Sequence, residues 1–470
     1  MKACKPSMID RRNFIRRSAL AAVGSSSFSS LTTQFNLAHA QVGGADDYRA
    51  LVCVFLYGGN DAFNMLVPRS LGEHTTYADT RRSLAIARED LLPLNPTNSL
   101  PADYGLHPQM PDLKNLFDDG KLSLIGNVGT LIEPTLQSDY VNQRVELPPQ
   151  LFSHNDQQNF VMSLQSNRNR QGWASRIADL MIDTNTNQNL SMNIALSGSN
   201  TFQTGGLQAP YAIGAGGVND YWSLQPGNTE EWSVRRNAAY DALLAQSRSH
   251  LFATEFARTQ RRSIDLGVEL RQALNAVSAP QTAFDGSSRL ASMLSMVSHL
   301  IAARQQLGMK RQIFFVGIGD YDTHGDQINR HPTLMNELNH ALTSFYNATV
   351  ELGVSDKVTT FTASDFGRTL TSNGDGTDHG WGSHQMVMGD GVDGGKIFGT
   401  MPELAIGSND DIGEGRIIPT TSVDQYAATL AGWYGLTPSQ IAETFPTLAN
   451  FNLILSEALF KSAESEYANN

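Results

Sequence analysis

The sequence predicts an α/β protein, a three-layer α/β/α sandwich around a mostly parallel central sheet. Apolar runs rich in β-branched and aromatic residues recur along the chain, and stretches with helical spacing separate them. A run that is apolar at every position is typical of a strand buried on both faces, as in a parallel sheet covered by helices. The alternation of such strands with helices indicates a doubly wound sheet.

Four apolar segments are expected to form buried strands, and they cover residues 50–57, 122–128, 313–318 and 358–363. Helices are expected at residues 110–117, 153–165, 334–352 and 422–434. The last of these opens with a Ser-x-x-Gln capping box, which is typical of a helix N-terminus. Residues 372–395 are dominated by Gly and Asp, and we expect them to be loop.

The first 40 residues are expected to be a twin-arginine signal peptide. Arg11 and Arg12 precede a short apolar stretch, and Ala38-His39-Ala40 forms a small-x-small cleavage pattern. The stretch is too short and too rich in Ser and Gly to span a membrane. The alternative is a disordered basic tail, but the order of the three features favours a signal. We therefore expect the twin-arginine translocase to export the chain to a periplasmic or secreted location.

The remaining chain is expected to form one α/β domain over residues 46–460, with an insertion at about 184–307. The formal net charge is −12, and the signal holds six basic residues and one acid, so the net charge after it is near −17. This charge argues against binding nucleic acid or anionic lipid through a basic surface. No apolar run after the signal reaches the length of a membrane helix. Cys53 is the single cysteine there, so we expect no internal disulfide.

Polar residues gather after the predicted strands, where ligands bind in sheets of this kind. Each has a structural alternative, such as a turn or helix cap or a satisfied core histidine. The joint pattern favours a metal site, because carboxylate oxygens and imidazoles bind Zn, Mn or Fe, and Mg or Ca where carboxylates dominate. The candidate ligands are Asp61, Asp322, His324, Asp365, Asp378, His379 and His384.

Five segments resemble the motif set of a known family: YGGNDAFNMLVP, LFSHNDQQ, YDTHGDQ, SDFGRT and DHGWGSH. The chain is similar to the domain-of-unknown-function 1501 family of secreted bacterial proteins, and through it to the alkaline phosphatase and sulfatase superfamily. The likeness covers nearly the whole chain after the signal. It implies an alkaline-phosphatase-like fold, one or two divalent metal ions, and a Ser, Thr or modified Cys nucleophile at a helix start.

The resemblance also implies roles for single residues. Asp61 matches the superfamily's first metal aspartate. Asp322 and His324 match its aspartate–histidine metal pair, although the superfamily's usual spacing is longer and Asp320 would restore it.

Asp365 matches the superfamily's late-strand aspartate, and His384 or His379 matches the final metal histidine. The departure is Phe366, because the superfamily has histidine after this aspartate. One metal ion then lacks a ligand unless Asp378 or His379 supplies it, which leaves full dimetal phosphatase activity an open question.

Three further residues are candidates for catalysis. Ser153 precedes a predicted helix, whose N-terminus would favour an anionic transition state, but it also matches a simple helix cap. His154 is a candidate metal ligand or acid. Arg368 has a planar guanidinium suited to clamping a phosphate or sulfate, or to a structural salt bridge.

Two functions follow from these residues. The first is a metal-dependent hydrolase of phosphate or sulfate esters, acting on an anionic small-molecule substrate through Ser153 or a metal-bound hydroxide. The second is a secreted protein of the same fold without catalysis, used in binding or surface assembly. The missing histidine at position 366 favours the second, whereas Asp322, His324, Asp378 and His379 favour the first.

Overall fold

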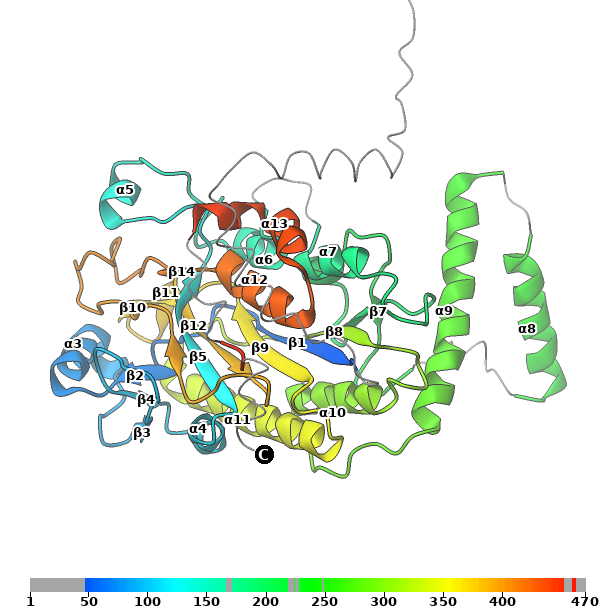
Figure 1. The fold of residues 1–470 in the computed structure, drawn as a ribbon, viewed down its shortest axis with the longest axis horizontal. Helices are drawn as coiled ribbons and strands as arrows, with labels where there is room; N and C mark the ends of the chain where they lie inside the picture. The colour runs from blue at the N-terminus through cyan, green and yellow to red at the C-terminus, as the bar shows by residue number, and fades with distance from the viewer. Residues whose placement is uncertain are drawn as a thin grey trace, which may run out of the picture.

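The computed structural model describes residues 47–165, 171–218, 224, 228–246, 249–451 and 459–461. The predicted signal peptide lies outside the described residues. The described chain is built around a nine-stranded sheet of order β13-β5-β12-β9-β1-β8-β6-β7, with β14 paired to β5 (Figure 1). Its strands are β1 (Arg49–Leu56), β5 (Leu122–Gly129), β6 (Asn193–Ala195), β7 (Tyr211–Ala212), β8 (Arg311–Ile318), β9 (Val358–Ser364), β12 (Ser383–Met388), β13 (Ile397–Phe398) and β14 (Thr421–Ser422).

Helices cover both faces of the sheet, and β1 shows how the faces divide. Leu51, Cys53 and Phe55 pack into one hydrophobic cluster, and Ala50 and Val52 pack into another. Alternate residues of a strand point to opposite faces, so both faces of β1 are buried. One layer holds α6 (His154–Ser163), α7 (Trp173–Leu180), α12 (Val423–Tyr434) and α13 (Pro438–Thr444). The other holds α4 (Pro111–Asp118), α10 (Arg289–Ala302) and α11 (Gln327–Glu351). The predicted three-layer α/β/α sandwich is confirmed.

Smaller elements lie beside the sheet. One group is β2 (Leu66–Pro68), β3 (Leu92–Pro93) and β4 (Tyr104–Leu106), which pair with one another and lie next to α3 (Leu71–Arg81) and η1 (Arg82–Leu84). The others are α5 (Gln137–Val141), η2 (Thr201–Gln203), β10 (Arg368–Ser372), β11 (Thr377–His379) and η3 (Pro446–Asn450).

The four predicted strands are confirmed as β1, β5, β8 and β9, with ends within two residues of the prediction. The Ser422–Gln425 capping box at α12 is present. The helix predicted to start at residue 334 instead starts at Gln327, seven residues earlier. Pro332 lies inside this helix. Pro332 lies past the first turn and cannot donate to the carbonyl of Ile328, so the sequence pattern at this point indicates a break and hides the start of the helix.

The prediction of loop throughout residues 372–395 is wrong. The six residues of β12 lie in this stretch and fill the place between β5 and β9, antiparallel to both. Every residue of β12 is buried. The glycines and aspartates on either side hide this short strand in the sequence, and only pairing with two neighbours makes it favourable. Because β12 is antiparallel, its first residues lie at the carboxyl edge of the parallel strands.

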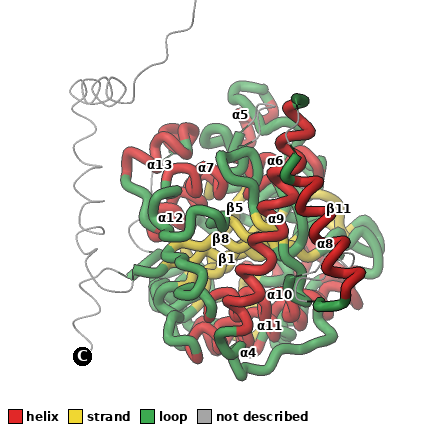
Figure 2. Tube along the Cα trace, turned by 90° about the vertical axis from the view of Figure 1, so that its right-hand side faces the viewer, coloured by secondary structure: helices red, strands yellow, loops and turns green. Residues whose placement is uncertain are grey.

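The predicted insertion contributes to the body of the sheet as well as to its surroundings. The strands β6 and β7 extend the edge beyond β8, and α10 lies in a helical layer. The helices α8 (Glu231–Leu244) and α9 (Leu251–Asn275) stand at the side of the body and run next to each other (Figures 1 and 2). Within the described ranges, no helix has the length and apolar character needed to cross a membrane.

Candidate metal centre

The loops after β1, β8 and β9 meet at the carboxyl edge of the sheet. Gly58 has a φ of +114°, and a Cβ there would lie 2.3 Å from the backbone nitrogen of Asp322. Only glycine fits such a position, so the loop after β1 lies directly against the loop after β8. The backbone N–H of Gly58 also donates to Asp365 Oδ2 at 3.2 Å, which fixes the loop after β9 to the same point.

Three histidines turn their Nε2 atoms toward the carboxylate of Asp322. The Nε2 atoms of His324 and His379 lie 3.1 and 3.4 Å from Asp322 Oδ1. The Nε2 atom of His154, from the first turn of α6, lies 3.5 Å from Asp322 Oδ2. We call these four residues the Asp322 cluster. Their side chains are between 22% and 43% exposed, so the cluster opens to solvent.

The opposite ring nitrogen of His154 is held by a buried carboxylate. His154 Nδ1 donates to Asp365 Oδ2 at 2.6 Å, and Gln158 Nε2 donates to the same oxygen at 2.8 Å. Gln158 lies one turn along α6 from His154 and belongs to the LFSHNDQQ motif. A carboxylate behind a histidine orients the ring and makes the far nitrogen a stronger ligand.

The other two histidines are held in the same way. His324 Nδ1 donates to Asp378 Oδ1 at 2.9 Å, and Asn373 Nδ2 donates to that oxygen at 3.1 Å. His379 Nδ1 donates to the backbone carbonyl of Phe152 at 2.7 Å. With each Nδ1 acting as a donor, the neutral rings present Nε2 as a lone pair.

The Asp322 cluster fits a divalent metal ion. The Nε2 atoms of His324 and His379 lie only 2.9 Å apart, and two lone pairs at this distance repel unless a cation or proton lies near them. His154, Asp322 and His379 each offer a ligand atom, and these atoms lie within 4.8 Å of one another. Imidazole nitrogens with one carboxylate are donors that zinc and similar transition metals bind.

Arg368 holds Asp322 in place. Its Nη1 donates to Asp322 Oδ1 and, at 3.1 Å, to the carbonyl of Gly58. Nη2 and Nε donate to the carbonyl and hydroxyl of Thr377. The side chain is 0% exposed, and its guanidinium donates to Asp322, Gly58 and Thr377 inside the protein. Burial alone would raise the pKa of Asp322, but the hydrogen bond and charge of Arg368 lower that pKa below its ordinary value.

The pKa values of two histidines move in opposite directions. The hydrogen bond to Asp365 raises the pKa of His154. Burial lowers the pKa of His379, although its bond to the Phe152 carbonyl acts in the opposite direction. His379 is therefore ready to bind a cation at neutral pH, whereas a proton competes more strongly at His154.

Phe366 supports the rings of the cluster. Its ring centroid lies 4.9 Å from that of His154 and 4.6 Å from that of His379. A Cβ on Gly59 would lie 2.5 Å from the Phe366 ring, so the ring packs directly on the turn after β1. The residue that departs from the superfamily pattern thus fills space beside the cluster with an apolar ring.

Ser153 lies at the N-cap position of α6, next to His154, but its side chain makes no capping hydrogen bond. Its hydroxyl instead donates to Asp156 Oδ2 at 2.9 Å. The structure therefore places Ser153 beside the cluster in the chain, with its hydroxyl turned toward Asp156.

Two predicted ligands, Asp61 and His384, lie in a separate buried group. Asp61 is 0% exposed, and the side chains of Arg81 and Gln327 donate to its Oδ2. His384 is 2% exposed, its Nδ1 accepts from the backbone N–H of Asn127 at 3.0 Å, and its ring packs edge-on against Phe63. Nothing in the sequence marks Arg81 or Gln327 as partners of Asp61.

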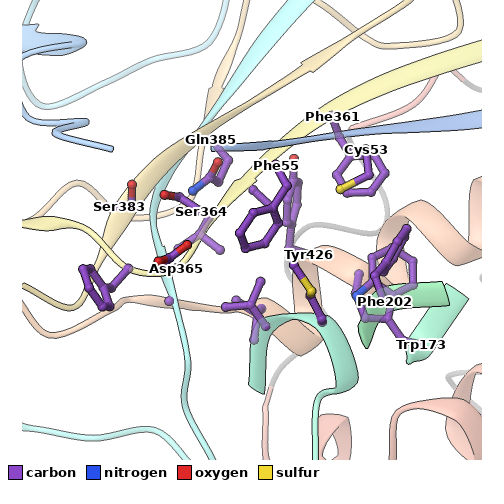
Figure 3. A pocket seen from close by; sticks show the side chains of 18 residues that line it. Cys53, Phe55, Trp173, Phe202, Phe361, Ser364, Asp365, Ser383, Gln385 and Tyr426 are labelled. Atoms are coloured by element: carbon purple, nitrogen blue, oxygen red, sulfur yellow. The ribbon is translucent and has the colours of Figure 1, made fainter. Parts of the chain in front are cut away.

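A narrow cavity lies behind Asp365 (Figure 3). Ser364, Asp365 and Ser383 form its polar end, and Trp173 and Phe202 lie at its apolar end. Its volume of about 30 Å³ has room for one or two water molecules but not for an ester.

Solved structures with a similar fold, all at low similarity, include a protein in the alkaline phosphatase superfamily, a sulfatase and a phosphonate monoester hydrolase. A protein in the alkaline phosphatase superfamily from Vibrio parahaemolyticus is 10% identical, with 85% of this chain and 68% of that chain covered and a TM-score of 0.38. A sulfatase from Pseudoalteromonas sp. is 8% identical, covering 92% and 76% with a TM-score of 0.37. A phosphonate monoester hydrolase from Silicibacter pomeroyi is 9% identical, covering 82% and 73% with a TM-score of 0.33. Likeness of this size does not bear on activity.

The sequence itself matches one family. No curated protein matches the chain. The family model described as protein of unknown function (DUF1501) matches residues 48–445, which include β1, β8, β9 and the whole Asp322 cluster. The predicted family is thereby confirmed, and the chain belongs to the DUF1501 family of proteins of unknown function.

Proposed function

We propose that this protein is an exported, metal-dependent hydrolase of phosphate or sulfate esters. The observation that carries the proposal is the convergence of three histidine Nε2 atoms on one exposed carboxylate, each with its Nδ1 already bonded. A structural metal site is closed, whereas a catalytic site keeps an open face for water or substrate. The solvent-exposed side of the Asp322 cluster supports the second kind.

The residues around the cluster have separate tasks in this proposal. A divalent ion held by His154, Asp322, His324 and His379 would polarise the ester oxygens and offset the negative charge that develops during attack. Asp365 keeps the proton of His154 on Nδ1 and so keeps Nε2 free. Arg368 prevents Asp322 from turning away.

Ser153 remains the candidate nucleophile. Its hydroxyl donates to the carboxylate of Asp156, which orients the oxygen lone pairs and offers an acceptor for the hydroxyl proton. Ser153→Ala is expected to keep the metal affinity within about twofold and to lose most of the turnover rate, because a nucleophile acts only in the chemical step. An unchanged rate in this variant would make Ser153 a structural residue, with water as the attacking group.

Hydrolysis is tested directly with the purified, zinc-loaded chain. Release of nitrophenol from p-nitrophenyl phosphate, bis-p-nitrophenyl phosphate and p-nitrophenyl sulfate is measured with and without chelator. Asp322→Asn is expected to remove chelator-sensitive activity. The matched control is Asp112→Asn, because Asp112 also lies beside a histidine and both carboxylates are 41% exposed.

A zinc-loaded chain that cleaves none of these esters would favour the alternative, a secreted protein of this fold with a binding or assembly role.

Export is the remaining part of the proposal, and it rests on the sequence of residues 1–40. Replacing Arg11 and Arg12 with lysines is expected to leave precursor in the cytoplasm, because the arginine pair is what the twin-arginine translocase reads. Fractionation followed by immunoblotting measures this, and normal periplasmic delivery of the double variant would contradict export by this route.

A further inference from the structure

We propose that the Asp322 cluster holds one transition-metal ion of the zinc class per chain, and that Arg81 and Phe366 close the neighbouring place to a second ion. This rests on the metal centre of the proposed function and adds the number and the chemical class of the ions. It also divides the predicted ligands into three groups, which bind the ion, orient its ligands or take no part.

The class of ion follows from the donor atoms. Three of the four atoms that converge at the cluster are imidazole nitrogens, and the fourth is a carboxylate oxygen. Magnesium and calcium prefer six or more oxygen ligands. Zinc, ferrous iron and cobalt accept imidazole in sets of four to six ligands. The cluster therefore selects against the alkaline-earth ions.

Two of the predicted ligands orient the histidines instead of binding the ion. The carboxylates of Asp365 and Asp378 each accept from a histidine Nδ1, at 2.6 and 2.9 Å. Those histidines point their Nε2 atoms away from the carboxylates and toward Asp322. The oxygen of each carboxylate that holds a histidine is therefore taken, although Asp365 Oδ1 is buried without a hydrogen-bond partner.

Asp61 is the carboxylate that a second ion would need, and although its Oδ1 is buried without a hydrogen-bond partner, the charge of Arg81 opposes an ion there. Arg81 is 0% exposed and its guanidinium contacts Asp61 Oδ2. Its Nε donates to Asn64 Oδ1 and its Nη1 to the carbonyl of Thr369, both at 3.0 Å, so the positive charge is fixed there. A divalent cation next to Asp61 would be repelled by this charge in a site that water does not screen.

Phe366 fills the space between the turn after β1 and the histidine rings of the Asp322 cluster. Its ring packs on Gly59, which lies between Gly58, bonded to Asp365, and Asp61. An apolar ring supplies no ligand atom. Within the described residues, His154, Asp322 and His379 form the one group of three His, Cys, Asp or Glu ligand atoms within 4.8 Å of one another, and Asp61 belongs to no such group.

The test counts ions on the intact protein. Chelator-stripped protein is reloaded with zinc and analysed by native mass spectrometry, and isothermal titration calorimetry with zinc is repeated in excess magnesium or calcium chloride. We expect one zinc ion per chain and no competition from either salt. Two zinc ions per chain, no bound zinc, or displacement of zinc by magnesium or calcium would overturn the inference.

Substitutions of Asp322 and Asp61 test whether the ion binds at the Asp322 cluster. Asp322→Asn is expected to weaken zinc binding by more than about 100-fold, beyond the usual effect of residues that only orient ligands. Asp61→Asn is expected to leave one ion bound with its affinity within about twofold, and loss of the ion from folded Asp61→Asn would overturn the inference. If Asp61→Asn does not fold, the ion count on the unaltered chain decides. Ester hydrolysis is measured separately, so an inactive chain with one zinc ion refutes the proposed function alone.

Discussion

Two groups of carboxylate and imidazole side chains lie near the same edge of the sheet, and they differ in exposure and in where the positive charge comes from. In the Asp322 cluster the carboxylate is 41% exposed and faces three histidine nitrogens. In the second group, which we call the Asp61 group, Asp61 is 0% exposed and its counter-ion is Arg81. His331 and His384 belong to the Asp61 group and are also buried.

If the ion binds as proposed, residue type alone does not make a metal site. In the Asp61 group a guanidinium already neutralises the carboxylate, although Asp61 Oδ1 is buried without a hydrogen-bond partner. The Asp322 cluster also contacts a guanidinium, that of Arg368, but the Nε2 atoms of His324 and His379 lie 2.9 Å apart and the cluster opens to solvent. An incoming cation improves the second arrangement and disturbs the first.

Removing Arg81, the counter-ion of the Asp61 group, should cause the largest change in free energy, a loss of folding stability. Arg81→Met leaves a buried carboxylate unpaired, which costs about 3–5 kcal/mol of unfolding free energy. Urea denaturation measures this, and zinc affinity should not change. Arg258→Met is the matched control, because Arg258 pairs with Glu255 while 76% exposed and should cost at most about 0.5 kcal/mol. A similar loss in both variants would show that the Asp61–Arg81 pair contributes nothing special.

Removing the carboxylate of the Asp322 cluster should lower the zinc affinity more than the stability of the fold. Asp322→Asn takes away a ligand, so zinc affinity should fall by more than about 100-fold, or about 2.7 kcal/mol. Unfolding in the presence of chelator should lose less free energy than in Arg81→Met, because Asp322 is 41% exposed and the asparagine oxygen still accepts from the buried Arg368 guanidinium. Calorimetry and urea denaturation measure the two quantities. Asp112→Asn should alter neither, and unchanged zinc binding by Asp322→Asn would place the ion elsewhere.

The sequence identifies most of the framework and part of the site. The strands β1, β8 and β9 are apolar at nearly every position, so their buried runs are visible without structure, and the loops after them carry Asp322, His324 and Asp365. The sequence does not reveal which ring nitrogen of a histidine points toward Asp322, or which group accepts a hydrogen bond from the other nitrogen. The partner of Asp61 is Arg81, at the end of α3, and no spacing rule connects them.

Acid should destabilise the Asp61 group. Burial lowers the pKa of His331 to about 4 and that of His384 to about 3. The unfolded chain, with histidine pKa values near 6.5, therefore binds protons first as pH falls, and stability is lost from about pH 6.5 downward. Asp424 acts with the opposite sign, because burial raises its pKa to about 6 and its protonation favours the folded state.

The loss from His331, His384 and Asp424 together should be about 2 kcal/mol between pH 7 and pH 5, since each pKa unit corresponds to about 1.4 kcal/mol. His107 adds to this loss, because burial lowers its pKa to about 3. Urea denaturation in the presence of chelator measures it without a contribution from metal release. Equal stability at the two pH values would mean that these histidines are not held neutral by burial.

The smallest change in free energy should come from Asp378, the more exposed of the two carboxylates that orient histidines, and it should be a change in zinc affinity. Asp378 is 48% exposed and holds His324 through Nδ1. Asp378→Asn should weaken zinc binding on the order of tenfold, the lower end of the effect for residues that orient metal ligands. Asp365→Asn, at a fully buried carboxylate, should weaken it more. Calorimetry compares the zinc affinities of the two variants. A larger loss of affinity in Asp378→Asn than in Asp365→Asn would contradict the stronger orienting role of Asp365.

Anomalous diffraction at the zinc edge from crystals of the zinc-loaded protein separates the two groups most directly. One peak is expected, at about 2.0–2.2 Å from a carboxylate oxygen of Asp322 and from the Nε2 atoms of His154, His324 and His379. No peak is expected near Asp61 or His384. A peak between Asp61 and His384, or a second peak of equal height at Asp365, would contradict a single zinc site built on Asp322.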